Sequence, residues 1–391
     1  MQPTRKPGPL SGLLVVDMTH VLAGPYCTML LADLGARVIK VEPPEGDGAR
    51  KIGPFLKDQS VYFMSVNRNK ESIALNLTTE ADRAILHELL ARADILVENF
   101  RPGTAEKLGL GWEALHASCP RLIFASISGF GQTGPYRRRP AFDMVVQAMG
   151  GIMSLTGHPD SPPTRVGISI GDLASGMFAA IGIQAAVIER NRTGSGTRID
   201  VSMLDCQVAL LENALARYQA TGELPSPIGA RHPTAAPFDV FRAGDGWIAI
   251  TASPDPMFRA LCEALGDPGL ASDERYADRQ ERVDHQAELK GRIEARLQAK
   301  PVREWLEILE RKGVPCGPLN NVKDLLEDPQ LAAREMLVEL RDSSGPVLKV
   351  AGNPIKIGSL PADPIAFPPA LDEHRSRILD ELSRSRTARN G

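Results

Sequence analysis

Short apolar runs alternate with stretches of helical spacing over about the first 200 residues of the chain. Leu13–Asp17 and Arg37–Val41 are runs of the kind that forms buried strands. Pro25–Gly35 lies between them and has helical spacing, with a proline at its start and a glycine at its end. Strands separated by helices of this length indicate right-handed βαβ units and a mostly parallel sheet. Further strands are expected at Asp94–Val97, Arg121–Ile127 and Thr197–Val201, and further helices at Glu80–Arg92, Asp172–Arg190 and Met203–Thr221.

The pattern changes near Leu224, where a loop broken by prolines begins. A hairpin-like pair of strands around the turn Ala243–Gly246 follows, and then charged helices at Asp284–Ala299 and Val302–Lys312. At 391 residues the chain is also longer than a typical single domain of about 100–200 residues. We therefore expect two domains, with boundaries near residues 222 and 330.

Composition and charge narrow the class of protein. The net charge of −3 gives no reason to expect nucleic acid or an anionic membrane as a partner. No run reaches the roughly 18 apolar residues that span a bilayer, and the N-terminal segment MQPTRKPGPLSG lacks the apolar core of a signal peptide. The five cysteines are far apart and form no CxxC pair, which favours reduced thiols and a cytoplasmic protein.

Three common cofactor motifs do not fit the chain. Gly109–Ala114 matches GxGxxA, but a helical stretch precedes it, whereas the dinucleotide fingerprint needs a strand there. No GxxxxGK[ST] loop occurs, and the seven histidines show no HxxxH or HExxH spacing. We therefore expect no nicotinamide or flavin cofactor and no metal.

Four stretches follow one another in an order that is specific when they are taken together. They are LLVVDMTHVLAGPYCTMLLADLGARVIKVEPPEGD, SVNRNKESIALNL, DILVENFRPG and GISIGDLASGMFAAIGI. In order and spacing they resemble the family III CoA transferases, which include formyl-CoA and carnitine CoA-transferases and α-methylacyl-CoA racemase. The C-terminal stretch GVPCGPLNNVKDLLEDPQLAAREML is similar to the same family, and the resemblance covers about Leu10–Pro361.

The resemblance implies a fold that agrees with the pattern above. Residues 1–222 and the C-terminal segment 331–391 are expected to form a large Rossmann-like α/β domain. Residues 223–330 are expected to form a smaller α+β domain inserted between them. Members of the family form an interlocked homodimer, which the pattern of the sequence alone does not indicate.

The resemblance also gives Asp172 an expected role. From the residues alone, Gly171–Asp172 before a long helix is typical of a helix cap. A carboxylate at a helix start is favoured in its ionised form by the backbone N–H groups and the macrodipole. In the family, the aspartate at this position attacks the acyl-CoA carbonyl and forms an acyl–aspartyl anhydride, which the thiolate converts to an aspartyl-CoA thioester. We therefore expect Asp172 to be the catalytic nucleophile.

Coenzyme A is the expected co-substrate. His20–Ala23 follow a predicted strand and precede a predicted helix, so backbone N–H groups there can meet an anion or the adenine, although an ordinary strand-to-helix loop has the same pattern. Asn99–Arg101 follow another strand, at the carboxyl edge where ligands of open sheets bind. The resemblance implies CoA contacts at His20, Val21, Leu22, Ala23, Leu75, Asn76, Thr78, Asn99, Phe100, Arg101 and Lys107, of which Arg101 or Lys107 can pair with phosphates, and Arg68 and Lys70 are further basic candidates.

Two departures from the family pattern bear on the activity. Racemase members carry a histidine immediately before the acid that corresponds to Asp143, and this chain has Phe142, which cannot exchange protons. His20 or His158 could supply a base by another geometry. Where formyl-CoA transferases carry a mobile run of glycines, this chain has Gly229–Pro233, which disfavours exchange between oxalate and formate.

The remaining candidates concern the acid that accepts CoA. Asp143 borders the active site in the family and is expected to orient the substrate, unless it is only a helix-start acid. Arg231 and His232 can receive the distal carboxylate of a dicarboxylic acid. We expect CoA transfer from an acyl-CoA, with succinyl-CoA as the leading donor, to a small dicarboxylic acid such as itaconate, mesaconate or malate. An acyl-CoA racemase or isomerase, and a CoA-ester binding protein without turnover, are the alternatives.

Overall fold

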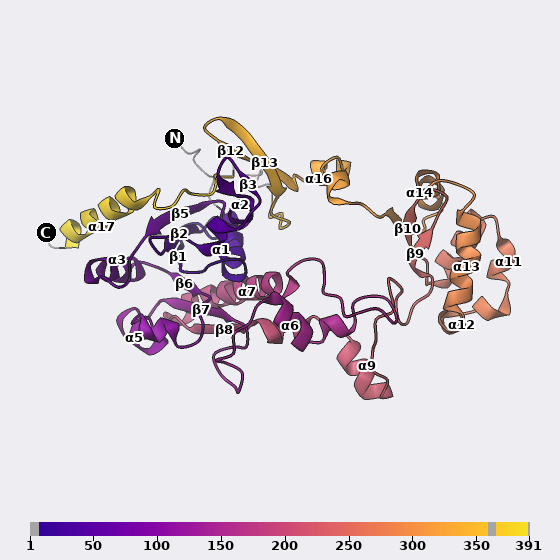
Figure 1. Cartoon of the computed structure of the whole chain (residues 1–391), viewed down its shortest axis with the longest axis horizontal. Coiled ribbons are helices and arrows are strands. Elements are labelled where there is room, and N and C mark those ends of the chain that lie inside the picture. Colours follow the sequence, from indigo (N-terminus) through magenta and orange to yellow (C-terminus); the bar gives the residue numbers. More distant parts are fainter. Residues whose placement is uncertain (1–7, 359–364, 390–391) are drawn as a thin grey trace. The chain divides into compact units, whose positions relative to one another are not determined.

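The computed structural model describes residues 8–358 and 365–389, and the chain divides into two compact units (Figure 1). The first unit contains the chain up to Met153, Arg165–Gly222 and the chain from Gln330 onward. The second unit contains Ser154–Thr164 and Glu223–Pro329. The boundaries expected from the sequence did not place the short segment Ser154–Thr164 in the second unit.

A six-stranded parallel sheet forms the centre of the first unit, in the order β5-β2-β1-β6-β7-β8. This confirms the predicted α/β fold with a parallel sheet. The chain order runs outward from β1 on one side and outward from β6 on the other, so the direction of winding reverses between these two strands. Open sheets bind ligands at the carboxyl edge beside such a reversal. The strands are β1 (Leu14–Asp17), β2 (Arg37–Glu42), β5 (Lys70–Ala74), β6 (Ile95–Glu98), β7 (Ile123–Ser128) and β8 (Arg198–Ser202).

Two helices cover one face of this sheet and contact each other closely. They are α1 (Ala23–Asp33) and α7 (Ile170–Thr193), and small apolar residues of both belong to one buried core with the strands. A Cβ atom added at Gly176 of α7 would lie 2.7 Å from the backbone oxygen of Ala23. Only glycine therefore permits this approach, which brings the start of α7 to the start of α1.

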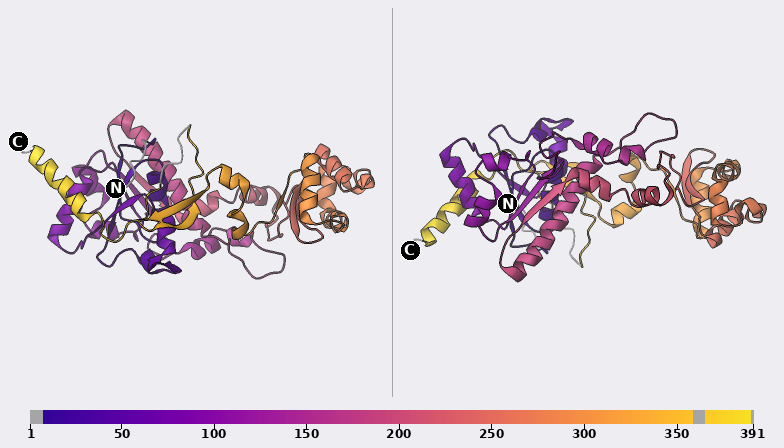
Figure 2. Two further views of the ribbon diagram at one scale, coloured as in Figure 1. Left: turned by 90° about the horizontal axis from the view of Figure 1, so that it is seen from above. Right: turned by 90° about the horizontal axis from the view of Figure 1, so that it is seen from below.

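The other face of the sheet packs against α3 (Glu80–Leu90), α5 (Trp112–Ser118) and the C-terminal helix α17 (Arg375–Arg389). Ile378 of α17 is buried in the same core as Leu86 of α3. The yellow C-terminal helix begins beside the indigo N-terminal part of the chain in Figure 1 and in both views of Figure 2. The remaining elements assigned mainly to this unit are η1 (Gly48–Lys51), β3 (Phe55–Leu56), β4 (Gln59–Ser60), α2 (Val61–Val66), α4 (Thr104–Lys107), α6 (Asp143–Met149), η2 (Ile152–Ser154), α8 (Met203–Ala209), α9 (Ala214–Thr221), α16 (Pro329–Ala333), β12 (Leu337–Asp342) and β13 (Gly345–Ala351).

The second unit has its own α+β core. Its antiparallel sheet has the order β11-β10-β9, and the hairpin that joins β9 to β10 turns at the residues predicted from the sequence. Phe241, Ile250 and Trp305 are buried between the sheet and the helices. The elements are β9 (Phe238–Arg242), β10 (Trp247–Thr251), α10 (Asp255–Ala264), α11 (Pro268–Ala271), η3 (Glu274–Tyr276), α12 (Arg279–Asp284), α13 (Gln286–Leu297), α14 (Val302–Arg311), β11 (Cys316–Pro318) and α15 (Val322–Leu325).

Two helices differ from the sequence prediction. The stretch Met203–Thr221 was predicted as one helix, but it forms α8 and α9 with a turn between them in which Glu212 has a φ of 52°. Helix α7 begins at Ile170 with Ser169 as its N-cap, so Asp172 is the third helical residue. The prediction that Gly171–Asp172 caps this helix is therefore wrong, although Asp172 does lie in the first turn.

Helix α7 is also unusual in its hydropathy. It has 24 residues, and its most apolar 18-residue window has a mean hydropathy of 1.5, which by length and composition alone is enough to cross a membrane. The sequence analysis did not identify this stretch as a candidate. In the structure 44% of that window is buried, and α7 packs on α1 and β7. A core helix of a folded domain has these properties too.

Candidate active site

Two loops meet where the winding of the sheet reverses. His20 follows β1 and Asn99 follows β6, and each holds the other: the backbone N–H of His20 donates to Oδ1 of Asn99 at 2.9 Å, and Nδ2 of Asn99 donates to the backbone oxygen of His20 at 2.8 Å. The imidazole of His20 stacks on the ring of Phe100, with 6.0 Å between the ring centres. Burial lowers the pKa of His20 even though Asp47 opposes the change, so the imidazole is neutral at pH 7. The residues predicted after these two strands therefore form one surface.

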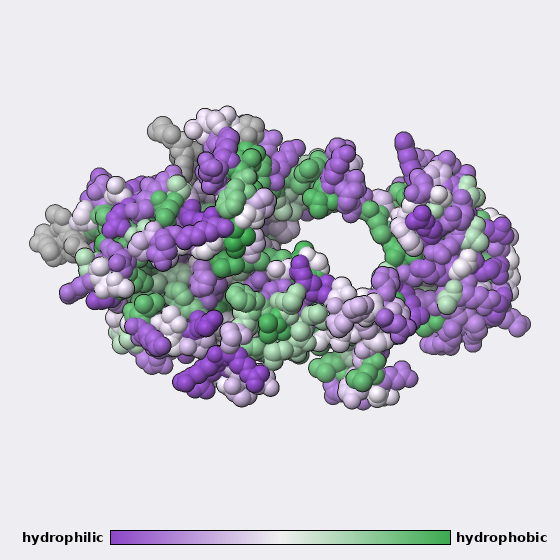
Figure 3. Space-filling model, viewed as in Figure 1, coloured by the Kyte–Doolittle hydropathy of each residue, from purple (hydrophilic) through white to green (hydrophobic). Residues whose placement is uncertain are grey.

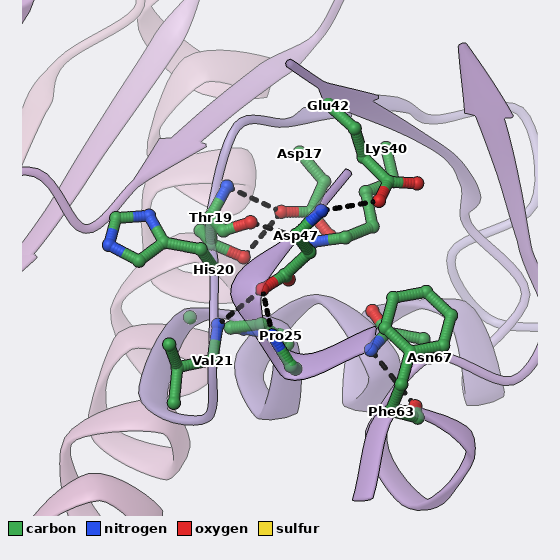
Figure 4. Close-up of polar contacts among 12 residues, drawn as sticks. Asp17, Thr19, His20, Val21, Pro25, Lys40, Glu42, Asp47, Phe63 and Asn67 are labelled. Atoms are coloured by element: carbon green, nitrogen blue, oxygen red, sulfur yellow. Dashed lines mark hydrogen bonds and ion pairs between the residues drawn. The ribbon is translucent and has the colours of Figure 1, made fainter. Parts of the chain in front are cut away.

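A network of buried charges lies beneath the loop that starts at His20 (Figure 4). Asp17 accepts hydrogen bonds from the backbone and hydroxyl of Thr19 and from the hydroxyl of Thr28, and pairs with Lys70 at 3.0 Å. Burial alone would raise the pKa of Asp17, but Lys70, Lys40 and the two hydroxyls bring it down to about 2. Asp17 is therefore ionised at neutral pH and anchors the carboxyl end of β1.

This network also removes two basic residues from the list of candidate phosphate ligands. Lys70 is buried and donates to Asp17, to Asn67 and to the backbone oxygen of Pro25. Arg68 is buried and pairs with Asp33 at 2.6 Å. Both cations are held inside the unit by these partners, so the interpretation of Arg68 and Lys70 as phosphate ligands is wrong.

Asp47 fixes the shape of the loop itself. Val21 has a φ of 66°, a left-handed conformation that a β-branched residue rarely adopts. Oδ1 of Asp47 accepts the backbone N–H of Val21 at 3.1 Å and that of Ala49 at 2.9 Å, and its other oxygen pairs with Lys40 at 2.9 Å (Figure 4). Such a conformation costs roughly 1–3 kcal/mol and persists only where its surroundings hold it. Asp47, which the sequence analysis did not single out, therefore holds the loop in shape.

The loop separates two cavities of the first unit. The larger has a volume of about 470 Å³, and the smaller has a volume of about 140 Å³ and contains Asp172. His20, Val21 and Phe100 line both cavities. Among the other residues predicted to contact CoA or substrate, Leu75, Asn76 and Thr78 line only the larger cavity, and Leu22, Ala23, Asn99 and Arg101 line only the smaller.

The walls of the larger cavity suit the long arm and the base of a CoA molecule. They include prolines and leucines beside backbone groups. Two of the three acidic side chains in the lining are paired with cations: Glu42 binds Arg50 at 2.7 Å and Asp47 binds Lys40, whereas no ion pair is formed by Glu45 within the described residues. Ligand sites are largely apolar with a few polar groups that fix orientation. Lys107, predicted as a phosphate ligand, lines neither cavity.

Asp172 is a carboxylic acid with an unusual pKa. Burial raises its pKa from the usual 3.8 to about 7, and the neighbouring carboxylate of Asp143 adds to this. At pH 7 the group is therefore about half ionised. The expectation that Asp172 stays ionised at a helix start is therefore wrong at neutral pH, because burial and the charge of Asp143 raise its pKa.

Asp143 contacts the chain just before Asp172. Its Oδ1 accepts the backbone N–H of Gly171 at 2.8 Å, and its Oδ2 accepts a hydrogen bond from Gln147 at 2.7 Å. A Cβ atom at Gly171 would lie 2.8 Å from Cγ2 of Val146 and 3.0 Å from Oδ1 of Asp143, so glycine is needed for this approach. Asp143 lines neither cavity. In this structure it positions the first turn of α7, and the expected contact with substrate stays a prediction.

The sequence analysis did not identify three further residues that lie near Asp172 or interact with it. Arg137 and Arg139 line its cavity, in the loop between β7 and α6. Burial raises the pKa of Tyr62 to about 12, and the charge of Asp172 contributes to the rise, so this phenol lies close enough to interact with Asp172 electrostatically. The run of three arginines shortly before Asp143 was the available signal, whereas nothing in the sequence pattern marks Tyr62.

The second unit contains the other two predicted substrate residues. Nδ1 of His232 accepts the backbone N–H of Thr234 at 3.1 Å, and its ring lies 5.0 Å from that of Phe238. Arg231 is exposed. Because both lie in the second unit, their role toward a substrate at Asp172 stays a prediction.

The glycine motif and the possible metal ligands considered above can be located in the structure. Gly109–Gly111 joins α4 to α5, so it is a turn between helices. In the part of the chain that the structure describes, no group of three or more His, Cys, Asp and Glu side chains is arranged to hold a metal ion.

Comparison with known proteins agrees with this geometry. The model of CoA-transferase family III matches residues 10–375. The chain is 49% identical to an acetyl-CoA:oxalate CoA-transferase of Acetobacter aceti, over 97% of each protein, and 44% identical to a succinyl-CoA:mesaconate CoA-transferase of Haloarcula marismortui, over 96% of each. A crystal structure of a CAIB/BAIF family protein from Brucella suis superimposes with a TM-score of 0.86 at 40% identity, covering 96% of this chain and 100% of that one. The chain therefore belongs to CoA-transferase family III and is an enzyme that transfers coenzyme A.

Proposed function

We propose that this enzyme moves CoA from succinyl-CoA to a small dicarboxylic acid through covalent intermediates on Asp172. The observation that carries the proposal is the position of Asp172 in the small cavity whose wall is shared with the larger one. A CoA molecule whose base and arm occupy the larger cavity would present its thioester across His20, Val21 and Phe100 to Asp172. Holding the thioester and the nucleophile in one place makes the attack effectively unimolecular.

The reaction needs no group other than the two acids, the thiol and Asp172. The carboxylate of Asp172 attacks the thioester carbonyl, the C–S bond breaks, and an acyl–aspartyl anhydride and CoA thiolate form. The thiolate attacks the aspartyl carbonyl, which releases the donor acid and leaves an aspartyl-CoA thioester. The carboxylate of the acceptor reverses these two steps and regenerates Asp172. Each step breaks one acyl bond and forms another, so no net proton is taken up.

The structure favours transfer over racemisation. Phe142 lines the cavity of Asp172 and is 75% exposed, so a phenyl ring stands beside the aspartate where a racemase would carry a base. A phenyl ring cannot remove or return a proton. His158 lies in the second unit, and His20 holds a neutral ring against Phe100. A binding protein without turnover is disfavoured because the relatives are named for transfer reactions.

The names of related enzymes suggest a broader set of acceptor acids than the one expected from the sequence. Oxalate and mesaconate appear in the names of relatives at 49% and 44% identity, and glutarate in that of one from Agrobacterium fabrum at 39% identity. All three are dicarboxylic acids. We therefore include oxalate among the acceptors to be tested, although the absence of a glycine run in Gly229–Pro233 argued against it.

We also propose that the enzyme is a cytoplasmic homodimer. Apolar side chains are exposed on α6 and α9 of the first unit (Figure 3), including Met144 at 57% and Leu215 at 51%, and on α7 Ile188 is 72% exposed. Exposed apolar patches of this kind mark protein–protein contacts. The five cysteines are all free in the structure, which suits a reducing compartment. Light scattering coupled to gel filtration tests the dimer, and a monomeric mass would contradict it.

Trapping the intermediate tests the central proposal. The enzyme is incubated with succinyl-CoA, quenched with hydroxylamine or borohydride, and digested for mass spectrometry. We expect a modification at Asp172 that requires the acyl-CoA, and none in Asp172→Asn. Full activity in Asp172→Asn, or a wild-type enzyme that transfers CoA without modification at Asp172, would refute the mechanism.

A further inference from the structure

The loop between β7 and α6 contains three consecutive arginines, which differ in whether they line the small cavity. Arg137 and Arg139 line the small cavity with Asp172, and Arg138 between them does not. All three are exposed in the loop. Two of the three arginines of this loop therefore line the cavity that also contains Asp172.

The arginine loop is anchored at several points. A Cβ atom at Gly129, after β7, would lie 2.4 Å from Cβ of Ala141, so the two ends of the loop touch. The backbone N–H of Gln132 donates to Asp200 at 2.9 Å. The guanidinium of Arg139 lies 3.9 Å from the ring centre of Tyr136. These contacts hold the arginines beside the carboxyl edge of the sheet.

The charges of the small cavity do not balance. Its lining contains three cations, from Arg101, Arg137 and Arg139, and one carboxylate, that of Asp172. No carboxylate within residues 8–358 and 365–389 forms an ion pair with Arg137 or Arg139. A cavity with this surplus of positive charge favours a ligand that brings an anion.

The size of the cavity indicates which part of the ligand carries that anion. A volume of about 140 Å³ holds a short acyl group but not a nucleotide with its phosphates. We infer that Arg137 and Arg139 bind the distal carboxylate of a dicarboxylic acyl group whose other end reacts at Asp172, and so make the enzyme selective for dicarboxylic acids. This inference rests on the proposed function. Guanidinium groups suit the role because they bind carboxylates in a bidentate manner.

The experiment compares acids that differ only in the distal charge. Arg137→Gln and Arg139→Gln are assayed with succinyl-CoA and with butyryl-CoA as donors, and Arg138→Gln is the matched control from the same run. We expect kcat/KM for succinyl-CoA to fall about 10- to 100-fold in the first two variants, the loss of one charge-assisted contact, and to change less than about twofold with butyryl-CoA. Arg138→Gln should leave both unchanged, and Arg139→Lys should recover part of the loss.

The CoA phosphates are the other anions that these arginines could meet. The same variants are therefore assayed with succinyl-dephospho-CoA, which lacks the 3′-phosphate. If the arginines bind that phosphate, the variants lose activity equally with succinyl-CoA and butyryl-CoA and no longer discriminate against the dephospho ester. Either an equal loss with both donors or no loss with succinyl-CoA would overturn the inference.

Failure of the inference can be told apart from failure of the proposed function. If trapping modifies Asp172 while the arginine variants retain their selectivity, the nucleophile stands and the binding site for the distal carboxylate lies elsewhere. Arg231→Gln, in the second unit, is then the next variant to assay. If trapping leaves Asp172 unmodified, the proposed mechanism itself fails.

Discussion

The half-buried carboxyl of Asp172 should make the folded protein less stable as pH rises, and Asp172→Asn should remove that effect. The group has a pKa of about 7 when folded and its usual 3.8 when unfolded. Below pH 3.8 it is protonated in both states and has no effect. Between these values only the unfolded state ionises, so its free energy falls relative to the folded state. Above pH 7 both states are ionised and the cost stays constant.

The size of the effect follows from the same two values. They differ by about three pH units, each equivalent to about 1.4 kcal/mol, so the full cost is about 4 kcal/mol above pH 7. Asparagine has the same shape and no charge. The free energy of unfolding of Asp172→Asn should therefore exceed that of the wild type by almost nothing near pH 4 and by up to about 4 kcal/mol near pH 8.

Asp205 offers a matched control. It is the third residue of α8 after the N-cap Ser202, as Asp172 is the third residue of α7 after Ser169, but Asp205 is exposed. Urea unfolding of the wild type, Asp172→Asn and Asp205→Asn is followed by circular dichroism between pH 4.5 and 8.5. A gain in Asp172→Asn that is the same at every pH, or a gain as large in Asp205→Asn, would refute the argument from burial.

Three other substitutions test the remaining parts of the site. In the proposed mechanism Asp172 attacks in its ionised form, so kcat/KM of the wild type should rise about tenfold from pH 6 to pH 8. Asp143→Asn should move the midpoint of this profile to lower pH, and a midpoint that does not move would show that Asp143 has no effect on the ionisation of Asp172. Asp47→Asn should weaken the anchor of the strained loop and raise KM for CoA esters roughly tenfold with kcat less affected, measured by steady-state kinetics; an unchanged KM would contradict this role. Gly176→Leu should push α7 away from Ala23 and lower the free energy of unfolding by about 3 kcal/mol or more in urea titrations, whereas a stable, active variant would show that the helices can separate freely.

The sheet and its edge could be predicted because their signals are local. Alternating apolar runs and helical spacing identify parallel strands, and residues that follow parallel strands share an edge, which is why His20 and Asn99 were expected near each other. The start of α7 was misplaced by two residues because Ser169, Gly171 and Asp172 are all acceptable near a helix start.

The features that were missed or wrong depend on contacts between distant parts of the chain. The pKa of Asp172 depends on burial and on Asp143, which is 29 positions earlier in the sequence, and neither is visible in a helix-start pattern. Lys70 was a basic candidate for contact with phosphate, yet β5 places it inside the unit beside Asp17. Arg137 and Arg139 were visible as part of a basic run, but only the position of their loop shows which of the three arginines line the cavity that contains Asp172.

The shared wall between the two cavities constrains how this enzyme can diverge. A change at His20, Val21 or Phe100 alters the lining of both cavities, so under the proposed function natural variation at these positions would affect every substrate at once. Arg137, Arg139 and Phe142 line only the small cavity. Under the proposed function, new preferences for acids would arise by substitution in that single loop while the recognition of CoA is inherited unchanged. Such a modular arrangement would allow one scaffold to give rise to a series of acid-specific transferases.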